Sequence, residues 1–266
     1  MKKSSPIQII ILMICIISSL SAFAQIDTIR LKDKRLLTSM LKPSLNQYLV
    51  YSQKKNSKTL TFSLWLRNIE LKDRNGEKVF SITQHWYRSD TTTIKSIYIY
   101  SLNNAVDFSP IYHAETVNGE IKAYNWYNDK ITAADSLAQN RQKGFSLDFK
   151  TPNFNWNLDI ETFEMLPLGK GKTFAINFYD AGLNPPRYVI YKVTGSEMLT
   201  MLNNEKVDCW KLITEGDSKG VHYSETFWIS KKGHEFLKEE DVNPSGYRYK
   251  IKMLGSSPDL MARFAN

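Results

Sequence analysis

Four histidines are the side chains in this sequence best suited to metal binding or acid–base chemistry: His85, His113, His222 and His234. No two of them have a spacing that would bring two imidazoles to one metal within a helix or a strand. In His113-Ala114-Glu115 an imidazole and a carboxylate would share one strand face, which could orient the ring or, with His85, hold a metal. A hydrogen-bonded surface histidine is the commoner outcome, so we predict no metal site.

Other catalytic patterns are incomplete. Gly195-Ser196-Glu197 lacks the second glycine and the following helix of a nucleophile elbow. The segment 169–172 (GKGK) follows a predicted helix and precedes a predicted strand, the reverse of the order in a phosphate-binding loop. Asp159, Glu161 and Glu164 crowd the start of a predicted helix, where the helix dipole is sufficient reason for acidic side chains. We therefore predict no catalytic residue and no cofactor.

The first 24 residues have the three parts of a secretory signal in the usual order: Lys2 and Lys3, the apolar run Ile7–Ile17, and the motif Ala22-Phe23-Ala24. We expect cleavage before Gln25 and a periplasmic mature chain. The alternatives are an uncleaved anchor, for which the apolar run is short of the roughly 20 residues of a membrane helix, and a lipoprotein. The lipoprotein would need a small residue before the acylated cysteine, but Ile14 precedes Cys15.

Of the two cysteines, Cys15 leaves with the predicted signal and Cys209 remains without a disulfide partner in the same chain. Cys209 lies in a strand-like run, and its sequence neighbours supply no base or cationic pocket. We therefore predict a buried, inert thiol rather than a nucleophile.

The composition is that of a globular protein, with 42% hydrophobic and 23% charged residues and a net charge of +8. Basic residues occur singly or in pairs, such as Lys54-Lys55 and Lys231-Lys232, and form no continuous stripe. This pattern predicts no nucleic-acid partner, while weak contact with an anionic membrane surface is compatible with it.

Alternation of apolar and polar residues with period two predicts a mainly β protein. The expected strands are 59–66, 79–87, 94–100, 113–117, 120–127, 173–179, 187–193, 207–213, 221–229 and 247–254. Asn75-Gly76 and Asn118-Gly119 predict tight hairpins, because both residues accept positive φ. In the segment 97–100 the residues on both faces of the expected strand are apolar. This predicts a strand that is covered on both faces, at least locally.

Two segments have apolar residues at the spacing of a helix. The first is 31–41, which precedes Pro43. The other is capped by Asn157 or Asp159, with Trp156 as a hydrophobic staple, and runs to Leu166, where Pro167 and Gly169 stop it. We predict an N-terminal extension over 25–43, a single antiparallel curled sheet or open barrel over 44–255 with one or two short helices, and a C-terminal tail over 256–266.

The second half of the chain carries a resemblance. Its elements are Leu166-Pro167-Leu168-Gly169-Lys170-Gly171-Lys172, then 191–197 (YKVTGSE), 207–211 (VDCWK), 227–230 (FWIS) and 249–254 (YKIKML). Over residues 85–255 this order resembles the exported bacterial family known as domain of unknown function 3108. The resemblance implies an antiparallel, β-rich envelope protein and no established chemistry. Asn203-Asn204-Glu205 stands where a more glycine-rich connection is expected.

With no complete catalytic motif, the remaining feature is the aromatic content: 13 Phe, 6 Trp and 14 Tyr, or 33 residues in total. Rings in a curled sheet either fill the core or line a concave apolar surface. Taking the second option, we name as ligand-binding candidates Trp86, Tyr98, Tyr100, Tyr112, Tyr124, Trp126, Trp156 and Tyr179. The sequence favours a non-catalytic periplasmic carrier or assembly factor for an apolar, lipid-like envelope component. The alternatives are a protein-interaction module of the envelope and a hydrolase built around His113 and Glu115.

Overall fold

The structure, a computed structural model, describes residues 26–88, 96–183, 185–218 and 220–254. The predicted signal over 1–24 and the predicted tail over 256–266 lie outside the described residues, and the domain limits stay a prediction. None of the described helices is both long and apolar enough to cross a membrane.

The described strands belong to one sheet, which is antiparallel except where β1 and β10 run parallel to β11. In the first part of the chain the strands are β1 (Ile26–Ile29), β2 (Ser44–Lys54), β3 (Thr61–Arg74), β4 (Glu77–Arg88), β5 (Ser96–Asn104), β6 (Pro110–Val117), β7 (Glu120–Trp126), β8 (Lys130–Ala133), β9 (Ser146–Asp148) and β10 (Phe154–Asn155). In the second part they are β11 (Thr173–Tyr179), β12 (Arg187–Thr200), β13 (Lys206–Ser218), β14 (Val221–Ser230), β15 (Phe236–Asn243) and β16 (Gly246–Lys252). The strand order is β1-β11-β12-β13-β14-β15-β16-β2-β3-β4-β5-β6-β7-β8-β9.

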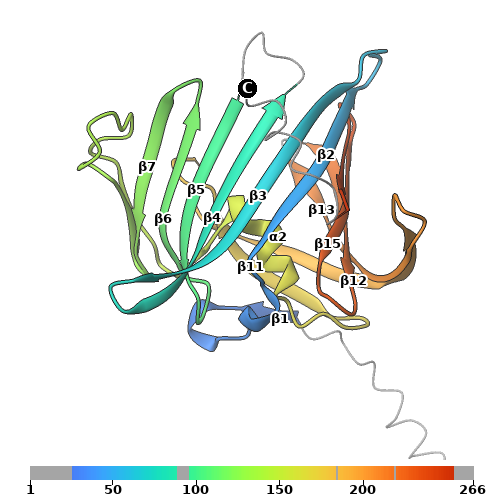
Figure 1. Cartoon of the computed structure of the whole chain (residues 1–266), viewed down its shortest axis with the longest axis horizontal. Coiled ribbons are helices and arrows are strands. Elements are labelled where there is room, and N and C mark those ends of the chain that lie inside the picture. The colour runs from blue at the N-terminus through green and yellow to red at the C-terminus, as the bar shows by residue number, and fades with distance from the viewer. Residues whose placement is uncertain (1–25, 89–95, 184, 219, 255–266) are drawn as a thin grey trace, which may run out of the picture.

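The sheet curls around its own interior without closing into a barrel (Figure 1). Where its two ends approach each other, β7 and β8 meet the end of β11 through a set of buried side chains that we call the closing cluster: Tyr124, Trp126, Ile131 and Tyr179. The ring centroids of Trp126 and Tyr179 are 5.6 Å apart. The predicted class, a mainly β protein with a curled antiparallel sheet and short helices, is thereby confirmed.

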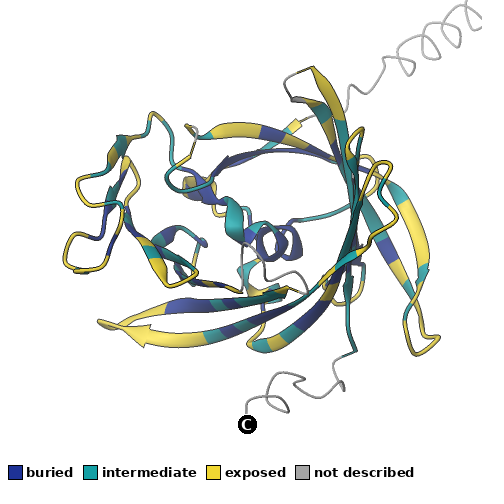
Figure 2. Ribbon diagram, turned by 90° about the horizontal axis from the view of Figure 1, so that it is seen from above, coloured by how far each residue is buried: buried dark blue, intermediate teal, exposed yellow. Residues whose placement is uncertain are grey.

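One helix occupies the interior of the curl (Figure 2). The 3-10 helix η3 (Trp156–Leu158) leads directly into α2 (Asp159–Glu164). Ile160 and Phe163 of α2 are fully buried, and the Phe163 ring lies 4.8 Å from those of Tyr191 and Phe227. The predicted helix therefore exists, but it is shorter than expected. The α-helix has no side-chain cap, because Asn155 caps the preceding 3-10 turn instead.

Two local expectations are wrong. The segment 31–41 forms two 3-10 turns, η1 (Leu31–Asp33) and η2 (Thr38–Met40), instead of one helix. Lys34, with a φ of 47°, interrupts the first turn, and Leu36 and Leu41 still reach the core. Strand β5 is not covered on both faces either: Ile97 and Ile99 are buried, whereas Tyr98 between them is 36% exposed.

The turn predictions are confirmed at both Asn-Gly pairs, with φ of 51° and 82° at Asn75-Gly76 and of 52° and 85° at Asn118-Gly119. Asn204, where the resemblance predicts glycine, has a φ of 64° and serves the same turn, because asparagine is among the residues that best tolerate this conformation.

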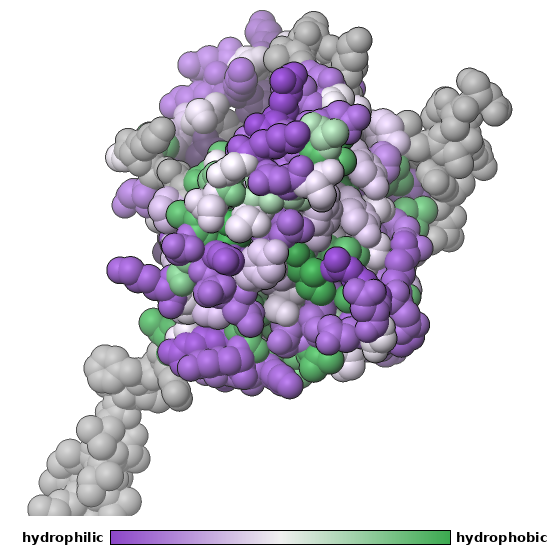
Figure 3. Space-filling model, turned by 90° about the vertical axis from the view of Figure 1, so that its left-hand side faces the viewer, coloured by the Kyte–Doolittle hydropathy of each residue, from purple (hydrophilic) through white to green (hydrophobic). Residues whose placement is uncertain are grey.

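The two surfaces of the sheet differ. On the side of the molecule shown in Figure 3, the outer surface is mainly hydrophilic, with hydrophobic side chains scattered across it. The inner surface packs around α2 in a core that includes Ile69, Ile82, Phe163, Phe227 and Ile229. We call this core the floor, because a polar cavity lined by Trp65 and Arg67 lies next to it, toward the end where β2 turns into β3.

Candidate functional site

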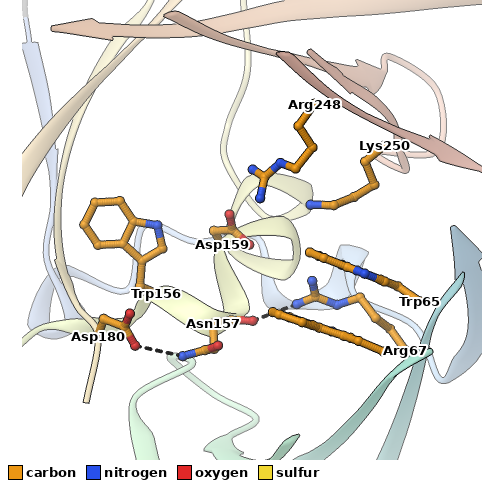
Figure 4. Close-up of a pocket in the computed structure, with 9 residues that line it drawn as sticks. Trp65, Arg67, Trp156, Asn157, Asp159, Asp180, Arg248 and Lys250 are labelled. Carbon is orange, nitrogen blue, oxygen red and sulfur yellow. Dashed lines mark hydrogen bonds between the residues drawn. The ribbon is translucent and has the colours of Figure 1, made fainter. Parts of the chain in front are cut away.

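The cavity above the floor, which we call the chamber, has a volume of about 260 Å³. It is lined by side chains from β3, β4, β16, the end of β11, η3 and the start of α2 (Figure 4): Trp65, Arg67, Trp86, Trp156, Asn157, Asp159, Asp180, Arg248 and Lys250. Strand pairing brings these distant segments together, since β16 pairs with β2, β2 with β3 and β3 with β4.

Tryptophan side chains form two sides of the chamber. Trp65 and Trp86 are directly opposite each other on β3 and β4, and their rings stack at 3.9 Å with an interplanar angle of 3°. The ammonium group of Lys250 lies 4.7 Å from the Trp65 ring, within range of a cation–π interaction. Trp156 lies across the chamber from Trp65, with Asp159 between them (Figure 4). The chamber therefore offers aromatic surface from two directions.

Arg67 joins the sheet to the helix. Its guanidinium donates to the Glu161 carboxylate at 2.9 and 2.6 Å and to the backbone oxygen of Asn157 at 2.8 Å. Arg67 and Glu161 are both almost fully buried. Burial by itself would lower the pKa of Arg67, but the Glu161 carboxylate outweighs it and holds that pKa above its ordinary value. Glu161 lies in the first turn of the helix, as expected of an acidic side chain favoured by the helix dipole, and the structure adds a bidentate buried ion pair that the sequence did not predict.

The two cations of β16 share one carboxylate. Glu239 of β15 accepts from both Lys250 and Arg248. Burial alone would raise the pKa of Glu239, but these two cations hold it below its ordinary value. Arg248 also lies 3.5 Å from Asp241, while its buried Nε has no hydrogen-bond partner among the described residues. Arg248 and Lys250 are thus the nitrogen donors that line this side of the chamber.

Carboxylates supply acceptors on the other side. Burial raises the pKa of Asp159, whose Oδ1 accepts from the Ile160 amide at 2.7 Å. Burial also raises the pKa of Asp180, which accepts from the Asn157 amide group at 3.1 Å. Higher on the inner surface, burial and the neighbouring Glu239 raise the pKa of Glu225 to about 7. The chamber thus combines donors, acceptors and aromatic rings.

The structure brings two of the eight predicted ligand-binding residues into this cavity, Trp86 and Trp156. Three others, Tyr124, Trp126 and Tyr179, are buried in the closing cluster. Tyr98, Tyr100 and Tyr112 alternate with inward-facing residues of β5 and β6 and lie on the outer surface, where the Tyr100 and Tyr112 rings are 6.0 Å apart. For all eight, ligand binding stays a prediction.

Sequence reasoning missed Trp65, Arg67 and Lys250. A charged residue in an alternating strand usually faces water, so the pattern alone predicts that Arg67 and Lys250 are exposed. A usable signal was present in β3: Trp65, Arg67 and Ile69 have the same parity, so Arg67 faces the interior with its apolar neighbours.

His113 is not the surface histidine that we expected. It is 2% exposed, and its Nδ1 lies 3.0 Å from both the Ser101 hydroxyl and the Asn155 amide nitrogen. Burial lowers its pKa to about 4, which favours a neutral ring that accepts at Nδ1. Among the described residues no group of three or more His, Cys, Asp or Glu is placed to hold a metal ion.

Cys209 is fully buried, and burial raises the pKa of its thiol to about 11. A thiol with this pKa is almost entirely protonated near neutral pH, so it is a weak nucleophile. This agrees with the expected inert cysteine.

Comparison with known proteins identifies the class to which this β-rich chain belongs. Residues 47–252 match the model of the family described as "Protein of unknown function (DUF3108)", and the chain is a member of that family. The match begins well before residue 85, where the sequence resemblance was first evident. No curated protein matches the chain.

A solved structure shares the fold: a β-barrel-like protein of domain of unknown function DUF1849 from Brucella abortus. The TM-score is 0.52, and the comparison covers 80% of this chain and 96% of that one. At 11% identity the similarity concerns the fold alone.

Proposed function

We propose that the protein is a non-catalytic binding protein of the cell envelope, a carrier or assembly factor that holds the hydroxyl-bearing head of an amphipathic component in the chamber. The observation that carries the proposal is the chamber itself, where Trp65 and Trp156 lie on opposite sides of a carboxylate and two cations (Figure 4). The predicted signal sequence supports an envelope location.

The mixture of polar groups favours hydroxyls over an ion of either sign. A hydroxyl both donates and accepts hydrogen bonds, so a polyol can use the carboxylates of Asp159 and Asp180 and also the nitrogens of Arg248 and Lys250. An anion would meet the two carboxylates, and a cation would meet the three basic residues Arg67, Arg248 and Lys250. A saccharide ring also presents apolar C–H faces that pack on tryptophan.

The apolar part of such a component needs a different location. The floor below the chamber is filled by the molecule's own side chains, with Ile160, Phe163, Phe178 and Phe227 at most 2% exposed. A cavity of about 260 Å³ is small beside the roughly 300–1,000 Å³ of drug-sized ligand pockets. We therefore assign the head group to the chamber and leave the hydrocarbon chain outside it, which refines the expectation of an apolar concave site.

The test uses octyl glucoside below its micelle concentration as an amphiphile with a sugar head, and sodium octanoate as a chain without one. We expect a saturable change in tryptophan emission with octyl glucoside and none with octanoate. Trp156→Ala should abolish the response, while Tyr98→Ala, a change on the outer surface, should leave it intact. Equal responses to both amphiphiles, or a normal response in Trp156→Ala, would contradict the assignment.

Native mass spectrometry after detergent-free purification gives an independent test. We expect a co-purifying amphipathic molecule that is lost in Trp156→Ala. The alternative function, a protein-interaction module, predicts a stoichiometric cross-linked partner and no bound small molecule. That outcome would replace the carrier proposal.

A further inference from the structure

The hairpin between β2 and β3 has an unusual charge distribution. Residues 34–69 contain no aspartate or glutamate. At the tip of this hairpin, Lys54, Lys55 and Lys58 are all exposed, and none forms an ion pair within the described part of the chain. These three positive charges are therefore available to an anionic partner.

A second hairpin tip, between β15 and β16, lies directly beside the first, because Gly246 pairs with Lys54. The two tips form a groove of about 360 Å³ whose lining includes Lys54, Lys55, Asn243 and Tyr247. Gly246 is required for this approach: its φ is 153°, and a Cβ there would lie 2.2 Å from the backbone oxygen of Gln53. The spacing of the two tips is thus fixed by the fold.

Apolar side chains surround the lysines. Leu60, Phe62 and Val242 are exposed by 42%, 42% and 49%. On the adjoining outer surface, the rings of Tyr51 and Tyr249 stack at 5.1 Å. Lysine together with aromatic and aliphatic side chains is the combination that peripheral proteins use at the boundary between lipid head groups and acyl chains.

We propose that these two adjacent tips, the basic rim, dock on the surface of an anionic lipid bilayer. The lysines meet lipid phosphates, and Leu60, Phe62 and Val242 enter the head-group region. The next tip along the sheet, between β13 and β14, carries Asp217, 3.6 Å from the Nδ1 of His222. In the sequence of that tip the charges of Asp217 and Lys219 cancel, so the contact is confined to the basic rim, where the positive charges are unopposed.

The rim and the chamber belong to the same end of the curl. Arg248 and Lys250 of the chamber follow Gly246 of the rim by two and four residues on β16. Docking through the rim therefore brings the chamber close to the bilayer from which an amphipathic component would be taken. The docking itself does not depend on a ligand in the chamber, so it goes beyond the proposed function and can be tested separately.

The experiment is co-sedimentation of the full mature protein with vesicles of phosphatidylglycerol and phosphatidylcholine in equal parts, compared with phosphatidylcholine alone. We expect binding to the anionic vesicles only, weakened by added salt. Since each lysine near such a surface contributes about 1 kcal/mol, the triple variant K54Q/K55Q/K58Q should partition roughly a hundredfold more weakly. The matched control K32Q/K34Q/K42Q removes the same charge from exposed positions before β2, at the opposite end of the molecule, and should bind nearly normally.

Leu60→Ser should weaken binding while leaving all charges in place. Equal binding to both vesicle types, or equal losses in the rim and control variants, would overturn the proposal. Tight binding of a protein partner to the rim without vesicle binding would overturn it too. The chamber gives an independent readout: the rim variant should respond to octyl glucoside normally, and Trp156→Ala should still sediment with anionic vesicles.

Discussion

The floor and the chamber are built from the same strands, yet their inward-facing side chains differ in character. On β3 the inward-facing residue changes from Ile69 in the floor to Arg67 in the chamber, and Trp65 belongs to both, since it is part of the core cluster and also lines the chamber. On β14, Phe227 packs against α2, whereas Glu225 two residues away is part of the charged upper interior. Strand alternation decides which residues face inward, but position along the strand decides whether they are apolar.

This difference indicates that the two parts of the interior have different roles, stability in the floor and binding in the chamber. The floor stabilises the fold by burying apolar area, as the rings around Phe163 illustrate. The chamber contains partly buried carboxyl groups whose pKa values are raised by burial, including Asp159 and Asp180. Such groups cost stability, so their presence fits a binding role better than a structural one.

The largest expected effect is at the boundary between the two regions. Arg67→Met leaves the buried Glu161 carboxylate without its partner and should lower the free energy of unfolding by about 3 to 5 kcal/mol. Urea denaturation monitored by circular dichroism would measure the loss. The double variant Arg67→Met/Glu161→Met removes both charges and should recover most of the stability. A single variant as stable as the wild type would show that the pair does not anchor the helix.

The pH dependence of stability should separate two buried groups of opposite sign. The pKa of His113 is lowered to about 4, so its contribution is complete above its unfolded value of 6.5 and is lost as pH falls toward 4. The pKa of Glu164 is raised to about 7, so its contribution is complete below its unfolded value of 4.5 and is lost as pH rises toward 7. Each contribution is on the order of 3 kcal/mol at most, and the two oppose each other between pH 4.5 and 6.5.

Single variants separate the pH-dependent contributions of Glu164 and His113 to stability. In Glu164→Gln one of two carboxyl groups with a pKa near 7 is removed and that of Glu225 remains, so the free energy of unfolding should fall less steeply between pH 4.5 and 7 than in the wild type. In His113→Asn both carboxyl groups remain without the opposing histidine, and stability should fall more steeply than in the wild type between pH 4.5 and 6.5. Thermal denaturation across this range is the measurement. Parallel pH profiles in the two variants would be inconsistent with the assigned pKa shifts.

A smaller effect is expected where the two ends of the sheet meet. Gly182 has a φ of 82°, and an added Cβ would lie 2.2 Å from the Tyr124 hydroxyl oxygen. Gly182→Ala should therefore displace the closing cluster and cost about 1 to 3 kcal/mol. Gly144→Ala, with a similar φ of 78° but open space around it, is the matched control for backbone strain alone. A greater loss in the control than in Gly182→Ala would discount the contact with Tyr124.

The smallest stability change is predicted inside the chamber. Asp159→Asn keeps an oxygen for the Ile160 amide and removes a carboxylate whose pKa burial has raised. The free energy of unfolding at pH 7 should stay within about 0.5 kcal/mol of the wild type or rise, whereas the response to octyl glucoside should weaken. A large loss of stability would assign Asp159 to the structural framework.

Much of the fold follows from local rules in the sequence. The alternation of apolar and polar residues predicted the strands, and the predicted strand Thr173–Tyr179 has the same bounds as β11. The site was harder to predict, because alternation distinguishes two faces without saying which one is inside. Of the rings named from the sequence, Trp86 faces the interior, whereas Tyr98 pairs with His85 of β4 and lies on the outer surface.

The pairing of distant strands explains the remaining omissions. Lys250 reaches Trp65 because β2 lies between β16 and β3, a neighbourhood formed by residues almost 200 positions apart. Nothing in the local sequence around residue 250 indicates a tryptophan nearby. A similar limit applies to 31–41, where apolar spacing is compatible with a helix but tertiary contacts of Leu36 and Leu41 select two tight turns.

Because the two ends of this sheet meet through side chains, the sheet differs mechanically from a closed barrel. In a barrel, every change of girth breaks a ladder of backbone hydrogen bonds. Here the overlap is held by rings and side-chain contacts such as that between the Trp126 indole and Asn153, 3.1 Å apart. A change in the space that this sheet encloses would therefore disturb side-chain contacts at the seam, while each strand keeps its hydrogen-bonded neighbours.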